Sequence, residues 1–154
     1  MVSPAGTLRI GAAENATWRA EVERVERVLA RFAAHDRVLE LAGGTGIWTP
    51  RLACAAAEPT VADASAEALE INRARLERDA NVRYVVADLF EWQPDAQYDV
   101  VAFTFWLSHV PPQRFDAFWD MVGRRLAKNG RVFFIDPVDG QARLSIIARS
   151  GQAR

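Results

Sequence analysis

The stretch LELAGGTGIW, residues 39–48, limits the possible folds most, because three glycines and a threonine follow directly on a short apolar run. Residues 38–41 have the length and composition of a buried strand, and the glycines end it. Pro50 then stands where the first turn of a helix tolerates a missing N–H. The sequence therefore predicts a strand, a tight turn and a helix in immediate succession.

The same succession of elements recurs along the chain. Further strands are predicted at 60–63, 82–88, 98–105 and 131–136. Helices are predicted at about 16–34, 66–78 and 112–126, the last of them ended by Asn129 and Gly130. Nearly continuous apolar strands separated by helices are typical of a parallel sheet covered on both faces. With right-handed crossovers, we expect an α/β, doubly wound, mostly parallel sheet.

Composition favours a single globular domain with small-molecule partners. The 154 residues are half hydrophobic, and 19 basic residues nearly balance 20 acidic ones. A net charge of −1 without a basic block predicts no binding to nucleic acid or to a membrane surface. The one cysteine, Cys54, is expected to be a small buried group, and it excludes a disulfide framework or a cysteine-based metal site. No signal peptide or membrane span is recognised, so we expect a cytoplasmic protein.

The residues that close the predicted strands point to a nucleoside ligand. In an open α/β sheet, ligands bind beyond the carboxyl ends of the strands. Strand two ends at Asp63 and strand three at Asp88, while Gly44 and Gly46 let the backbone approach a ligand. The separation from Gly46 to Asp63 is 63 − 46 = 17 residues, close to the roughly 20 between a glycine turn and its ribose-binding carboxylate.

The glycine turn fits phosphate-bearing ligands poorly. The dinucleotide pattern G-x-G-x-x-G needs a third glycine where this chain has Thr49, and a P-loop needs a lysine that LAGGTGIWT lacks. Acidic residues repel phosphates but suit a ligand that carries a sulfonium and an ammonium group. S-adenosylmethionine carries both.

Four motifs, taken in order, resemble those of class I S-adenosylmethionine-dependent methyltransferases. They are VLELAGGTGIWT, VADASAEALE, VVADLFEW with YDVV, and LAKNGRVFFID. The resemblance implies a Rossmann-like sheet of five parallel strands in the order 3-2-1-4-5. It also implies one cofactor-binding domain over 1–154, with an N-terminal helical segment at 1–35, a core at 37–136 and a short tail at 137–154.

The resemblance also implies which residues bind S-adenosylmethionine, with S-adenosylhomocysteine as the product. They are Glu40, Ala42, Gly43, Gly44, Gly46, Asp63, Ala64, Asp88, Leu89, Thr104 and Phe105. Glu40 and the turn at 42–46 hold the methionine portion, Asp63 the ribose hydroxyls and Asp88 the adenine amino group. Leu89 offers its backbone N–H to the adenine ring, and the residues at 104–105 border the methionine amino group.

The implied reaction is transfer of a methyl group to a small-molecule acceptor, for which oxygen, nitrogen and carbon nucleophiles all remain open. The loop at 105–112 faces the acceptor, and His109 is the candidate general base. The alternative is that His109 orders its loop by hydrogen bonding. The carboxylates of Asp136 and Asp139 are only a weak indication of a metal site, so no metal is expected.

Aromatic residues divide into two groups. Trp48 and Trp106 follow the glycine turn and strand four, where they pack either against the ligands or within the structure. The residues at helical spacing are expected in the core: Trp18, Phe115, Phe118 and Trp119.

Two departures from the family pattern carry expectations of their own. Ala42 replaces a usual glycine, so it must avoid positive φ or binding is weakened. Only 154 − 136 = 18 residues follow strand five, so the usual C-terminal strand pair is reduced or missing. Strand five is then an exposed edge, and the outcomes are a homodimer through that edge or an impaired enzyme. The alternative function is S-adenosylmethionine binding without transfer, as a truncated protein or partner subunit; a nicotinamide-linked oxidoreductase is a distant third.

Overall fold

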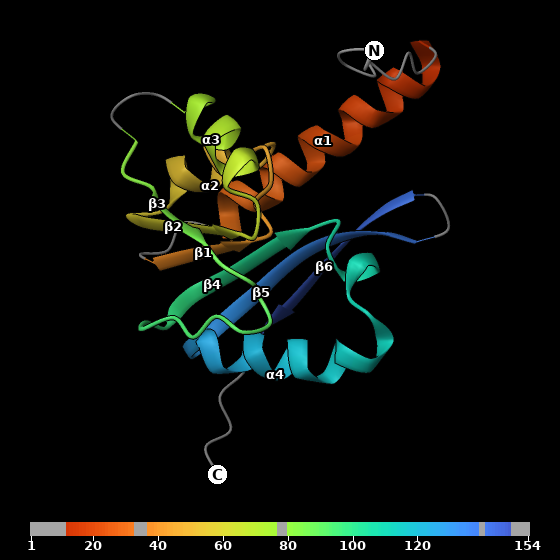
Figure 1. The fold of residues 1–154 in the computed structure, drawn as a ribbon. Coiled ribbons are helices and arrows are strands. Elements are labelled where there is room, and N and C mark those ends of the chain that lie inside the picture. Colours follow the sequence, from red (N-terminus) through yellow and green to blue (C-terminus); the bar gives the residue numbers. More distant parts are fainter. Residues whose placement is uncertain (1–11, 33–36, 77–79, 139–140, 149–154) are drawn as a thin grey trace, which may run out of the picture.

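The structure is a computed structural model that describes residues 12–32, 37–76, 80–138 and 141–148. In this part of the chain, six strands form one sheet in the order β3-β2-β1-β4-β5-β6 (Figure 1). The strands are β1 (Arg37–Leu41), β2 (Glu58–Asp63), β3 (Arg83–Val86), β4 (Tyr98–Thr104), β5 (Leu126–Val138) and β6 (Gln141–Ala148). Strands β1 to β5 are parallel, and β6 is antiparallel to β5. The predicted five-stranded parallel order 3-2-1-4-5 is confirmed.

Helices cover both faces of the sheet, as a doubly wound fold requires. The α-helices are α1 (Ala12–Phe32), α2 (Thr49–Ala55), α3 (Ala66–Ala74) and α4 (Phe115–Arg125). Figure 1 shows the first three on one face and α4 on the other. Two short 3-10 turns, η1 (Leu107–His109) and η2 (Pro112–Arg114), connect β4 to α4. None of the helices in the described ranges is long and apolar enough to cross a membrane.

Alternation along the central strands divides the core into two layers. Val38 packs toward α1 and α2, whereas Leu39 packs toward α4. The same alternation separates Val100 from Val101 on β4, and successive residues of a strand point to opposite faces. Glu40 therefore lies on the same face as Val38, below α2 and α3. This carboxylate is placed inside the fold.

The C-terminal strands differ from the sequence prediction. β5 begins at Leu126 rather than at Arg131, with a shift in register between these two residues. Asn129, with φ 63°, lies within that irregular stretch and does not end a helix, because α4 already stops at Arg125. β6 pairs with β5 along its length, so the expectation that strand five is an exposed edge is wrong. Among the described residues, β3 and β6 are the edge strands.

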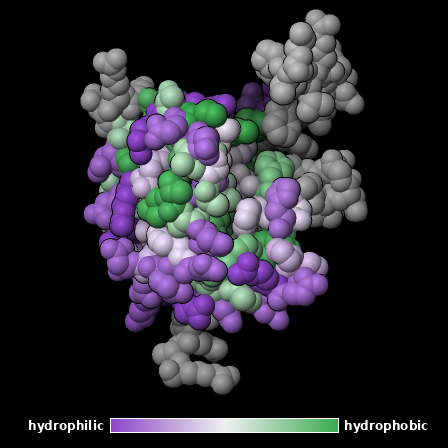
Figure 2. Space-filling view, viewed as in Figure 1, coloured by the Kyte–Doolittle hydropathy of each residue, from purple (hydrophilic) through white to green (hydrophobic). Residues whose placement is uncertain are grey.

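The side chains of the tryptophans and phenylalanines mostly serve packing. Trp48 is buried with α1 residues, which assigns it to the structure rather than to a ligand surface. Phe118 is fully buried and Trp119 packs beside it, as predicted, whereas Phe115 is 41% exposed. The side chain of Trp18 lies outside the described residues. Figure 2 shows such exposed apolar groups scattered among hydrophilic ones on the face in view.

Cys54 is exposed on α2, so the expectation that it is buried is wrong. Leu52 points into the core from the same helix and is 3% exposed. Residues two apart on a helix do not share a face, which explains the difference.

Candidate functional site

A tight turn leaves the sheet directly after β1. The N–H of Gly46 donates to the carbonyl of Gly43 at 3.1 Å, and the N–H of Gly43 donates to Ala62 of β2 at 3.4 Å. Three residues of this turn have positive φ: Ala42 at 52°, Gly44 at 52° and Gly46 at 85°. Ala42 therefore does not avoid positive φ, because the turn imposes the left-handed conformation on a residue with a Cβ. The other expected outcome, weaker binding of the cofactor, stays a prediction.

Asp63, at the end of β2, is bonded to this turn. One carboxylate oxygen accepts the N–H of Gly44 at 2.9 Å, and the other accepts the N–H of Ser65 at 2.8 Å. The Ser65 hydroxyl in turn caps α3 by accepting from Ala68. Asp63 is thus a turn former as well as a strand-end carboxylate. Because each carboxylate oxygen has two lone pairs, both oxygens can still accept a further donor.

Glu40 lies inside the protein on the other side of the turn, and only 4% of its surface is exposed. The Thr49 hydroxyl donates to its carboxylate at 2.6 Å. Burial raises the pKa of Glu40 from its ordinary value of 4.5 to about 7; the Thr49 hydrogen bond lowers it, and repulsion from Asp63 adds to the rise. Two carboxylates from adjacent strands therefore act on each other beside the glycine turn.

Asn72 and Tyr84 complete the surroundings of Glu40, and sequence reasoning missed both, together with the role of Thr49. Asn72 is fully buried on α3, and its Nδ2 donates to Thr49 Oγ1 at 2.8 Å. Tyr84 of β3 donates its hydroxyl to Asn72 Oδ1 at 3.0 Å. A signal for Asn72 was available, since it lies three residues after the buried Leu69 and therefore on the apolar stripe of the helix.

The residues expected at the adenine lie at the end of β3. Asp88 is exposed and accepts the N–H of Phe90 at 2.8 Å, whereas Leu89 is buried, with 3% exposure. The N–H of Ala87 donates to the carbonyl of Asp63 at 3.0 Å, which joins this segment to the end of β2. Ala64, beside Asp63, is exposed.

The residues expected near the methionine amino group lie at the end of β4. Thr104 ends the strand and is partly exposed. Phe105 has φ 53°, and its N–H donates to the carbonyl of Ile135 on β5 at 2.6 Å. This left-handed residue turns the chain out of the sheet into the following loop.

His109 stands on that loop with an exposed side chain. Its ring centroid is 6.5 Å from that of Trp106, and its backbone N–H donates to the Trp106 carbonyl at 2.9 Å. The loop is joined to β5 because the N–H of Ser108 donates to Asp136 at 3.0 Å. Asp139 lies outside the described residues, and the described ones contain no group of three His, Cys, Asp or Glu residues that could hold a metal ion.

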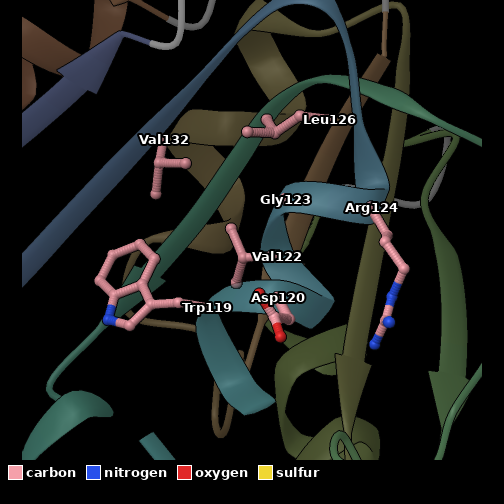
Figure 3. Close-up of a pocket in the computed structure, with 7 residues that line it drawn as sticks. All are labelled: Trp119, Asp120, Val122, Gly123, Arg124, Leu126 and Val132. Atoms are coloured by element: carbon pink, nitrogen blue, oxygen red, sulfur yellow. The ribbon is translucent and has the colours of Figure 1, made fainter. Parts of the chain in front are cut away.

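A separate pocket lies away from these residues. It has a volume of about 640 Å³ and is formed by α4 and β5 (Figure 3). Its lining residues are Trp119, Asp120, Val122, Gly123, Arg124, Leu126 and Val132. Leu126 begins β5, so the pocket lies toward the amino ends of the strands and away from the glycine turn. Glu40 and Asp63 are not among the residues that line this pocket. Their placement depends instead on the hydrogen bonds around the glycine turn.

A parallel sheet with a glycine turn after β1 and carboxylates at neighbouring strand ends has the arrangement of α/β proteins that bind ligands beyond the carboxyl ends of their strands. A family model described as a methyltransferase domain matches residues 38–130, which includes every element of this site up to α4. The chain belongs to this family of methyltransferase domains.

Individual relatives agree with the family. Demethylmenaquinone methyltransferase of Clavibacter sepedonicus is 38% identical over 82 residues, which are 53% of this chain and 34% of the relative. This chain thus spans about a third of that protein's length.

Solved structures agree as well. A structure described as a DhpI complex with SAM and HEP has a TM-score of 0.69 and 40% identity, and the match covers 81% of this chain and 56% of DhpI. The N-methyltransferase NodS of Bradyrhizobium japonicum, with a TM-score of 0.67 over 77% of this chain and 69% of NodS, is 21% identical and supports the fold alone.

Proposed function

We propose that the chain binds S-adenosylmethionine and transfers its methyl group to a small-molecule acceptor. The observation that carries the proposal is the pairing of Gly44 with Asp63 at 2.9 Å beside the buried Glu40. A turn held to one carboxylate and backed by another offers a negative site to a cationic adenosine derivative.

The residues present fit this cofactor. The turn at 42–46 carries no lysine or arginine, and the carboxylates of Glu40 and Asp63 beside it repel a phosphate. A sulfonium or ammonium group is attracted by the same charges. The related DhpI structures are described as complexes with SAM and with SAH, which supports the same cofactor here.

In the proposed reaction, the cofactor supplies an activated methyl group and the chain supplies placement. Asp63 accepts the ribose hydroxyls through its remaining lone pairs, and Asp88 accepts the adenine amino group. The turn and Glu40 hold the methionine portion, with Thr104 and Phe105 beside it. Alignment of the acceptor and exclusion of water account for most of the rate in a displacement whose leaving group is already activated.

His109 is the proposed general base on the acceptor side. Its ring is exposed on the loop that follows β4, and the contacts of Ser108 and Trp106 hold that loop in place. The unprotonated nitrogen of a neutral imidazole can accept a proton from a hydroxyl or amine acceptor.

Two measurements test the function. Calorimetry with S-adenosylhomocysteine and separately with NAD identifies the cofactor; we expect binding of the first and none of the second. Transfer of labelled methyl to a metabolite extract tests catalysis. Cofactor binding without transfer supports the alternative of a binding protein, and binding of NAD alone overturns the proposal.

We infer that any self-association uses an edge of the sheet. The edges among the described strands are β3 and β6, and β3 exposes Val86 by 59%. An edge strand presents unpaired backbone groups to a second copy. Sedimentation analysis of the wild type and of Val86→Lys tests this, because a charge on the edge should weaken a dimer formed through β3.

We infer a cytoplasmic location from the exposed thiol of Cys54. Exposed single cysteines persist as thiols in reducing compartments. Cell fractionation tests the location.

A further inference from the structure

The side chain of Asn72 contacts the glycine turn at several atoms. Its Nδ2 lies 3.2 Å from the carbonyl oxygen of Gly44 and 3.4 Å from that of Gly43. A Cβ on Gly46 would lie only 2.6 Å from Asn72 Cγ, so this amide packs directly against the turn. The turn and the side chain of Asn72 are therefore fitted to each other.

The partners of Asn72 fix which way its amide points. The carbonyls of Gly43 and Gly44 only accept hydrogen bonds, so the NH₂ group must face them. Oδ1 then faces Tyr84, whose hydroxyl must act as the donor at 3.0 Å. Burial raises the pKa of Tyr84 to about 12, so this hydroxyl keeps its proton over the whole neutral range.

The hydrogen bonds continue in the same donor-to-acceptor direction from Asn72 to Glu40. Thr49 Oγ1 accepts from Asn72 Nδ2 at 2.8 Å, which leaves the Thr49 proton free to point at the Glu40 carboxylate, 2.6 Å away. We call the four residues Tyr84, Asn72, Thr49 and Glu40 the Glu40 network. In it every hydrogen bond runs toward Glu40, and a donated hydrogen bond favours the ionised carboxylate.

We propose that Asn72 and Tyr84 are positioning residues, which hold the glycine turn and orient Thr49 so that Glu40 ionises more readily to receive the cofactor. This inference rests on the proposed function for its last step. The first step, the charge of Glu40, is a property of the chain itself and can be measured without any cofactor.

The other groups around Glu40 do not replace this effect. Asp63, from β2, carries a like charge that opposes ionisation of Glu40. Arg73 of α3 lies 4.8 Å from the ring centroid of Tyr84, and its charge opposes the rise in the pKa of Tyr84. From β4, Ala102 is the register partner of Glu40 and is uncharged. The hydrogen bonds of the network are thus the main support for the charge.

The test is a carboxyl ¹³C NMR titration of Glu40 in the free protein, with its signal assigned by Glu40→Gln. In Tyr84→Phe, we expect the midpoint to rise by about half a pH unit, because Asn72 Oδ1 loses its donor and the hydrogen bonds that follow in the network weaken. In Asn72→Ala, we expect a rise of about one unit, in line with the loss of part of a hydrogen bond to a charged group. Tyr98→Phe is the matched control, since Tyr98 is the other tyrosine and is buried at the start of β4.

Calorimetry with S-adenosylhomocysteine over pH 6 to 8.5 tests the second step. From the ionised fraction of Glu40 at pH 7, the rises above correspond to losses in affinity of about twofold for Tyr84→Phe and about fivefold for Asn72→Ala. These losses should shrink toward pH 8.5, whereas a merely structural defect weakens binding equally at every pH.

Each outcome decides something. An unchanged midpoint in Tyr84→Phe, or an equal rise in Tyr98→Phe, overturns the role of the network, and the mild Tyr84→Phe variant carries the test if Asn72→Ala does not fold. If the variants shift the midpoint of Glu40 but the wild-type protein binds no S-adenosylhomocysteine, the proposed function is overturned instead. A shifted midpoint with pH-independent losses in affinity overturns the link between the charge and binding.

Discussion

The hydroxyl of Thr49 donates a 2.6 Å hydrogen bond to the buried carboxylate of Glu40. Thr49 begins α2 and Glu40 lies near the end of β1, so this bond spans the glycine turn that separates them. This hydrogen bond offsets only part of the cost of burying the carboxylate, because the pKa of Glu40 is still raised to about 7.

Glu40→Gln should make the fold more stable at pH 8 and leave it nearly unchanged at pH 4.5. Because the pKa of Glu40 is raised in the folded state from 4.5 to about 7, the wild type is favoured below pH 4.5 and loses that stability as pH rises through 7. The loss is on the order of 2–3 kcal/mol. Urea unfolding of both proteins at the two pH values measures it. An equal difference at both values would show that Glu40 ionises as freely folded as unfolded.

Ala42→Gly should raise the free energy of unfolding by about 0.5–1 kcal/mol. Ala42 has φ 52°, where a Cβ is strained, and glycine relieves this strain at some cost in the entropy of the unfolded chain. Thermal unfolding checks the change. Ala62→Gly, in the middle of β2, is the control and should destabilise; a loss of stability in both variants would contradict the strain at Ala42.

Gly46→Ala should destabilise the protein by roughly 2 kcal/mol or more, because its Cβ would lie 2.6 Å from Asn72 Cγ in addition to the left-handed strain. Gly44→Ala is the matched control. It has positive φ too, but the nearest atom to its Cβ is 4.0 Å away, so only about 1 kcal/mol is expected. Chemical denaturation compares them. Equal losses would mean that the contact with Asn72 has no energetic weight.

The sequence predicted those features that follow from local pattern. The apolar run before the glycines predicted β1, and Pro50 marked the first turn of α2, as observed. Carboxylates at strand ends predicted that Glu40 and Asp63 would meet beside the turn, because parallel strands end at one edge of a sheet.

Features that depend on tertiary contacts escaped prediction. The residues around Ala42 in the sequence do not indicate a positive φ, because this conformation follows from the pairing of Gly43 with β2. The burial of Asn72 depends on the turn and Tyr84, which reach it from distant parts of the chain. The sequence did not decide the structure of the tail, because its residues are compatible with several local structures. β6 forms only through its pairing with β5, which is a tertiary contact.

His109→Ala should lower the rate of labelled methyl transfer to a metabolite extract by about a hundredfold or more if His109 accepts the acceptor's proton. Affinity for S-adenosylhomocysteine should stay the same, since His109 lies on the acceptor loop. Ser108→Ala, which leaves the backbone bond to Asp136 in place, is the control. Equal rates in all three proteins would assign His109 to the order of the loop alone.

The most direct test of the account is the affinity of Asp63 variants for S-adenosylhomocysteine, measured by calorimetry with folding checked by circular dichroism. We expect Asp63→Ala to weaken binding about a hundredfold and Asp63→Asn less, because the amide oxygen still accepts a bond. Asp99→Ala, which removes a carboxylate that accepts the N–H of Arg37 at the opposite end of the sheet, should bind as the wild type does. Unchanged affinity in a folded Asp63→Ala protein would contradict the placement of the cofactor at this strand end.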